Sequence, residues 1–185
     1  IVFPCDQDDT WHLDKVEKME KIMISNPDIN VLVGKYHKFF DEENQSAQRK
    51  NTTWESLALL VDKLADKKSL SVLDGSVIRE SFNESFLQMM PGCCFCVRKS
   101  FFMTIEPYWF EELGHDAFYT FFSKLTDSFA IYNSYVIEWR HHTGSTSRPR
   151  GRHKEIRLKE LERNEKVVST LEKFICNYPI QNVDK

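Results

Sequence analysis

The chain has 185 residues, of which 41% are hydrophobic and 13% aromatic, and this composition predicts a single packed domain over residues 1–185. The formal net charge of −3 is small, so charge alone indicates neither nucleic acid nor a membrane surface as a partner. No apolar run reaches the length of a membrane-spanning helix, and we therefore expect no membrane insertion.

Apolar residues recur at helical spacing through most of the chain, and glycine and proline are sparse, with six of each. In chain order, this spacing predicts helices over residues 10–25, 27–40, 53–66, 74–90, 93–106, 115–141 and 153–177. The fold class that follows is all-α, a helical bundle of six to seven helices without strands. On the last helix, the residues predicted to face inward are Leu161, Val168, Leu171, Phe174 and Ile175.

Two features favour a secreted, extracellular protein, and the first is a set of three N-x-[ST] triplets. They begin at Asn44, Asn51 and Asn83, and each is an acceptor sequence for N-linked glycan. Average composition gives roughly one such triplet by chance in a chain of this length. Chance occurrence is the alternative interpretation.

The second feature is the placement of the five cysteines. Cys5 lies near the start of the chain, Cys176 lies near its end, and Cys93, Cys94 and Cys96 cluster at the start of a predicted apolar helix. We expect Cys176 to bond to Cys93 or Cys94 and Cys5 to bond to a second member of the cluster, with Cys96 left over. A set of buried free thiols is the alternative.

Sequence motifs of catalysis are absent. The chain contains no G-x-S-x-G, no Walker loop, no dinucleotide-binding fingerprint and no H-E-x-x-H, so we expect no catalytic residue, no cofactor and no enzyme. The Cys93-Cys94-x-Cys96 cluster lacks the C-x-x-C spacing with which two thiolates hold one zinc ion. The sequence therefore predicts no metal ligand.

One basic cluster interrupts the even distribution of charge before the last predicted helix, and it consists of Arg148, Arg150, Arg152 and Lys154. It is interpreted either as a solvated loop or as a docking patch for a sulfated glycan such as heparan sulfate. Nucleic acid is not expected here, because no aromatic residue alternates with these charges.

Three stretches, residues 28–35, 93–106 and 121–129, resemble segments of the class II helical cytokines, and residues 171–176 lie where some members of that class place a C-terminal cysteine. Within that class, the likeness is to the interleukin-10 family, especially its interleukin-20 and interleukin-22 branch. The resemblance implies a helical-cytokine-like bundle that signals by binding a heterodimeric class II cytokine receptor at the cell surface. It also gives Asp28, Asn30 and Lys35 as candidate receptor-binding residues.

Two other classes of function stay open. A secreted helical carrier could enclose a small apolar ligand among the fourteen phenylalanines, although these would fill a dry core equally well. An intracellular helical interaction protein would have reduced thiols, and its N-x-[ST] triplets would be coincidental.

Overall fold

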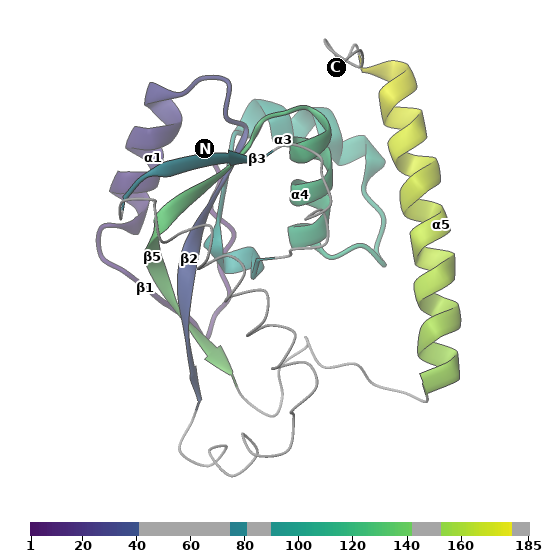
Figure 1. Cartoon of the computed structure of the whole chain (residues 1–185), viewed down its shortest axis with the longest axis horizontal. Coiled ribbons are helices and arrows are strands. Elements are labelled where there is room, and N and C mark those ends of the chain that lie inside the picture. The colour runs from purple at the N-terminus through teal and green to yellow at the C-terminus, as the bar shows by residue number, and fades with distance from the viewer. Residues whose placement is uncertain (41–74, 81–89, 142–152, 179–185) are drawn as a thin grey trace.

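The computed structural model describes residues 1–40, 75–80, 90–141 and 153–178. In chain order, the elements are β1 (Thr10–Trp11), α1 (Lys15–Ser25), β2 (Val31–Phe40), β3 (Val77–Glu80), the 3₁₀ helix η4 (Gly92–Cys94), β4 (Phe95–Val97), α3 (Lys99–Ile105), the 3₁₀ helix η5 (Glu106–Tyr108), α4 (His115–Leu125), β5 (Phe129–His141) and α5 (His153–Asn177). The part of the chain that is described is therefore mixed α/β, with four α-helices around a curled five-stranded sheet (Figure 1). The predicted all-α bundle of six to seven helices is wrong.

The strand β5 lies at the centre of the sheet, in the order β1-β5-β2-β4. It runs parallel to β2 on one side, and it pairs with β1 and β3 in antiparallel fashion at different points along its length. The strand β4 completes the sheet by pairing antiparallel with β2. This register places His37 of β2 and Thr10 of β1 on either side of Glu138 in β5.

The segment predicted as a helix over residues 27–40 forms β2 instead. Its first residues, Val31, Leu32 and Val33, are all fully buried, because the strand starts in the interior of the sheet. A short apolar run of this kind fits a buried strand or a buried helix equally well, so its periodicity does not separate the two. The next residue is Gly34, where a Cβ atom would overlap the side chain of Val136 on β5. Glycine thus allows the close approach at the irregular point of the ladder.

The segment predicted as one helix over residues 115–141 is a helix followed by a strand. The helix α4 ends at Leu125, and Asp127 has a positive φ of 51°. Ser128 then donates its backbone N–H to the carbonyl of Ser123, which closes the turn before β5 begins. Residues 129–141 are rich in aromatic and β-branched residues, which favour a strand.

Three more predicted helices contain strands, and one predicted helix is confirmed. Residues 10–25 divide into β1 and α1. Residues 93–106 divide into η4, β4 and α3, and residues 77–80 of the predicted helix 74–90 form β3. The expected helix over residues 53–66 lies outside the described residues. The last predicted helix, over residues 153–177, has the bounds of α5.

The helices α3 and α4 lie between the sheet and α5 (Figure 1). The helix α5 is anchored by Phe174, which is fully buried and makes edge-to-face contacts with Phe122 of α4 at 4.8 Å and Tyr108 of η5 at 5.2 Å between ring centroids. The inward stripe predicted for this helix is correct at Phe174 and at Leu171, which is partly buried against the core, whereas Leu161, Val168 and Ile175 are exposed.

We predict that Phe174→Ala lowers the free energy of unfolding by about 3–5 kcal/mol, because it removes a fully buried ring and its aromatic contacts with Tyr108, Phe122 and Tyr178. The neighbouring Ile175→Ala serves as the control, since that side chain is 42% exposed and its loss should cost less than about 1 kcal/mol. Urea unfolding followed by circular dichroism measures both values. Equal losses in the two variants would contradict this packing of α5.

Candidate functional site

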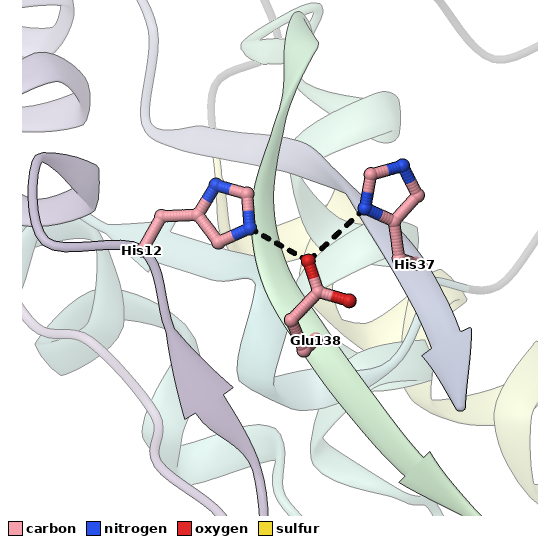
Figure 2. Close-up of side chains that lie close together, drawn as sticks. All are labelled: His12, His37 and Glu138. Atoms are coloured by element: carbon pink, nitrogen blue, oxygen red, sulfur yellow. Dashed lines mark hydrogen bonds and ion pairs between the residues drawn. The ribbon is translucent and has the colours of Figure 1, made fainter. Parts of the chain in front are cut away.

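Two histidines and one glutamate meet where three strands lie side by side. His12 follows β1, His37 belongs to β2, and Glu138 belongs to β5 between them. Figure 2 shows the Glu138 carboxylate between the two imidazole rings. Its Oε1 atom lies 2.9 Å from Nε2 of His12 and 3.0 Å from Nδ1 of His37.

The backbone register is the cause of this meeting. His37 is the direct cross-strand partner of Glu138 in the parallel pair of β2 and β5. On the other side, Thr10 pairs with Glu138, and His12 donates its backbone N–H to the carbonyl of Val136 at 3.0 Å. Because neighbouring strands are about 4.8 Å apart, side chains at these positions reach one another.

The site is open to solvent, and one aromatic ring supports it. The side chains of His12, Glu138 and His37 are 33%, 36% and 51% exposed. The ring of Tyr135 stacks on the His37 imidazole, with 3.6 Å between centroids and 19° between the ring planes. This stacking restricts the orientation of His37, so part of the entropy that ligand binding would otherwise remove is already lost.

The carboxylate at the centre of the site is held in its ionised form. The hydrogen bond with His12 is the main cause that lowers the pKa of Glu138, and the hydrogen bond with His37 lowers it further. One carboxylate oxygen and two imidazole nitrogens make a donor set that suits zinc and other divalent transition metals. The three ligand atoms all lie within 4.8 Å of one another.

The candidate receptor-binding residues do not form one site. Asp28 is exposed and forms an ion pair with Arg79. The backbone carbonyl of Asn30 accepts the N–H of Arg98 at 2.8 Å, which places Asn30 in the framework between β2 and α3. Lys35 approaches the histidine site, because its Nζ atom lies 5.8 Å from the ring of Tyr135.

The predicted disulfide frame is not formed in this structure. All five cysteines are free, with Cys93, Cys94 and Cys96 buried and Cys5 and Cys176 exposed. The alternative of buried free thiols therefore describes the central cluster. Cys176 lies exposed on α5, whereas the three clustered cysteines are buried at η4 and β4.

The remaining predicted sites fall outside the described residues. These are the three glycan acceptors and most of the basic patch, namely Asn44, Asn51, Asn83, Arg148, Arg150 and Arg152. Lys154 belongs to the first turn of α5, and its side chain is also outside the description.

Sequence reasoning missed His12, His37 and Glu138. In the chain, Glu138 lies 126 positions after His12 and 101 positions after His37. No fixed spacing marks them, because three different strands bring them together. Assigning the segments around His37 and Glu138 to strands would have been the first signal.

Comparison with protein-family models, with curated proteins and with solved structures finds no match to this chain. Among the described helices, none combines the length and the apolar character needed to cross a membrane.

We predict that Glu138→Gln destabilises the metal-free protein near neutral pH but not in acid. The folded-state pKa of Glu138 is depressed, so its stabilising contribution is present above the unfolded pKa and is lost as the pH falls through the folded pKa. The loss at about pH 6 should stay below about 1 kcal/mol, because the pair is solvent-exposed.

Urea unfolding at about pH 6 and again below the folded-state pKa of Glu138 tests this expectation. The control is Glu20→Gln on the exposed side of α1, which should show no comparable change with pH. A loss of stability in Glu138→Gln that persists in acid would show that the carboxylate does not act through its charge.

Proposed function

We propose that this protein binds a divalent transition-metal ion, with Zn²⁺ as the best-fitting ion, through His12, His37 and Glu138. The observation that carries the proposal is the position of one carboxylate oxygen at 2.9 Å and 3.0 Å from two imidazole nitrogens on adjacent strands. Two histidines and one carboxylate are a ligand set of zinc sites that keep one coordination position open.

The separations between the ligand atoms suit an ion. With metal–ligand bonds of roughly 2.1 Å, neighbouring ligand atoms lie about 3.0 Å apart around an octahedral ion and about 3.4 Å apart around a tetrahedral ion. The two observed nitrogen–oxygen separations, 2.9 Å and 3.0 Å, require only a small outward movement of the carboxylate. Binding then replaces two hydrogen bonds with metal–ligand bonds.

Three protein ligands leave at least one position of the ion to water. Because the three side chains are one third to one half exposed, that position faces solvent and can accept an anion or a side chain of another molecule. Metal binding is therefore the function that the geometry supports, and the open position is where further chemistry would take place.

The hypotheses from the sequence have less support. The secreted receptor ligand was inferred from a resemblance that implies a helical bundle, and the described residues form a mixed α/β fold instead. Binding to a class II receptor stays a prediction. For the carrier hypothesis, the ring contacts between Phe118 and Phe122 at 4.9 Å and between Phe122 and Phe174 at 4.8 Å favour a dry core over a ligand cavity.

We predict that Zn²⁺ shifts the imidazole NMR signals of His12 and His37 together at the concentrations that saturate this site. His12→Gln, His37→Gln and Glu138→Gln should each weaken the Zn²⁺ affinity measured by titration calorimetry at least about tenfold. Loss of a residue that only hydrogen-bonds to a metal ligand already has an effect of that size.

The matched control is Glu112→Gln, which removes an exposed carboxylate paired with Lys166 and should leave zinc binding at the three-strand site unchanged. Imidazole signals of His12 and His37 that stay unchanged at millimolar zinc would refute the proposal. A Glu112→Gln variant that weakens binding as strongly as Glu138→Gln would do the same.

A further inference from the structure

A second group of metal-ligand side chains lies at the start of β1, apart from the three-strand histidine site. One carboxylate oxygen from each of Asp6 and Asp9 and the Sγ atom of Cys93 all lie within 4.8 Å of one another. Cys93 is fully buried in η4, whereas Asp6 is exposed. The group therefore joins a solvent-accessible carboxylate to an interior thiol.

Asp9 offers this group a carboxylate oxygen that could bind a cation. Its Oδ1 atom accepts the backbone N–H of Arg140 at 2.9 Å, which fixes the carboxylate in place. Its Oδ2 atom is buried and, within the described part of the chain, has no partner at hydrogen-bonding geometry. Leaving a buried carboxylate oxygen without a partner is costly, so a cation at this oxygen would stabilise the folded chain.

A second unpartnered atom lies next to the same group. The Nε2 atom of His115 is buried and has no hydrogen-bond partner among the described residues. This atom lies so close to Gly92 that a Cβ atom on residue 92 would overlap the imidazole ring of His115. Gly92 directly precedes Cys93 in the chain. The atom therefore lies beside the residue that precedes Cys93, but it is not one of the three ligand atoms that lie within 4.8 Å of one another.

The charges around the group also favour a cation. The carboxylates of Asp6 and Asp9 lie close together, and a cation between them would relieve the repulsion between their negative charges. The nearby ammonium group of Lys15 contacts a backbone carbonyl and an aromatic ring. It donates to the backbone carbonyl of Cys93 at 2.6 Å and lies 3.6 Å from the ring centroid of Trp11.

We propose that Asp6, Asp9 and Cys93 form a second metal site, which takes a divalent cation with affinity for sulfur such as Zn²⁺, Co²⁺ or Cd²⁺. The thiolate ligand disfavours Mg²⁺ and Ca²⁺, which prefer sites made of oxygen alone. On binding, the thiol proton of Cys93 leaves to solvent and the sulfur forms a bond to the ion.

The test uses Co²⁺ with the full chain carrying His12→Gln and His37→Gln, so that the three-strand site cannot contribute. Titration should produce the near-ultraviolet thiolate-to-cobalt absorption band with one equivalent of Co²⁺. The band should disappear in Cys93→Ser and persist in Cys94→Ser. Asp6→Asn, a change at an exposed side chain, should weaken the apparent affinity at least about tenfold.

Asp14→Asn is the matched control, since Asp14 is an aspartate of the same N-terminal region that is paired with Lys18. It should leave the titration unchanged, and circular dichroism should show that every variant is folded. No thiolate band at millimolar Co²⁺ would overturn the proposal, as would a band that survives both Cys93→Ser and Asp6→Asn. Neither result affects the three-strand site, whose imidazole signals are read separately in the parent protein.

Discussion

The parallel pairing of β2 with β5 brings residues 31–40 beside residues 129–141, and the positions of all other strands follow from it. Parallel strands cannot be joined by a tight turn, so the chain must cross over between them. In the described part, that crossover contains η4, β4, α3 and α4, which supply the buried cysteines and much of the aromatic core. The same ladder sets His37 opposite Glu138, so the core and the histidine site share one structural origin.

The sequence predicted the helices better than the strands, for physical reasons. The helix α5 is dominated by glutamate, lysine, arginine and leucine, which favour a helix in any context, and its bounds were predicted correctly. The strands β2 and β5 contain buried apolar runs whose large residues also fall at helical spacing, so this spacing alone does not select the extended form that tertiary pairing stabilises. Exposed residues of α5 such as Leu161 were assigned inward because periodicity does not reveal how narrow the covered face is.

The candidate sites were beyond sequence reasoning for a related reason. The cysteine cluster was visible as a cluster, but whether Cys93 pairs with another cysteine or with a carboxylate depends on which segment packs against it. Likewise, the proximity of His12, His37 and Glu138 can be recognised only when the register of three strands is known. Ligand sets assembled from adjacent strands carry no spacing rule, unlike sets placed on one helix or one loop.

The two-residue strand β1 links both candidate metal sites. Asp9 directly precedes it and contributes to the thiol site, while His12 directly follows it and contributes to the histidine site. A strand this short is held by few hydrogen bonds, among them the bond from His12 N–H to Val136 and the bond from Arg140 N–H to Asp9. An ion at either site would therefore order the segment that the other site also requires. The first ion to bind meets the entropy cost of ordering this segment, so the second ion binds without that cost, and binding at one site should favour binding at the other. By thermodynamic linkage, the effect is reciprocal.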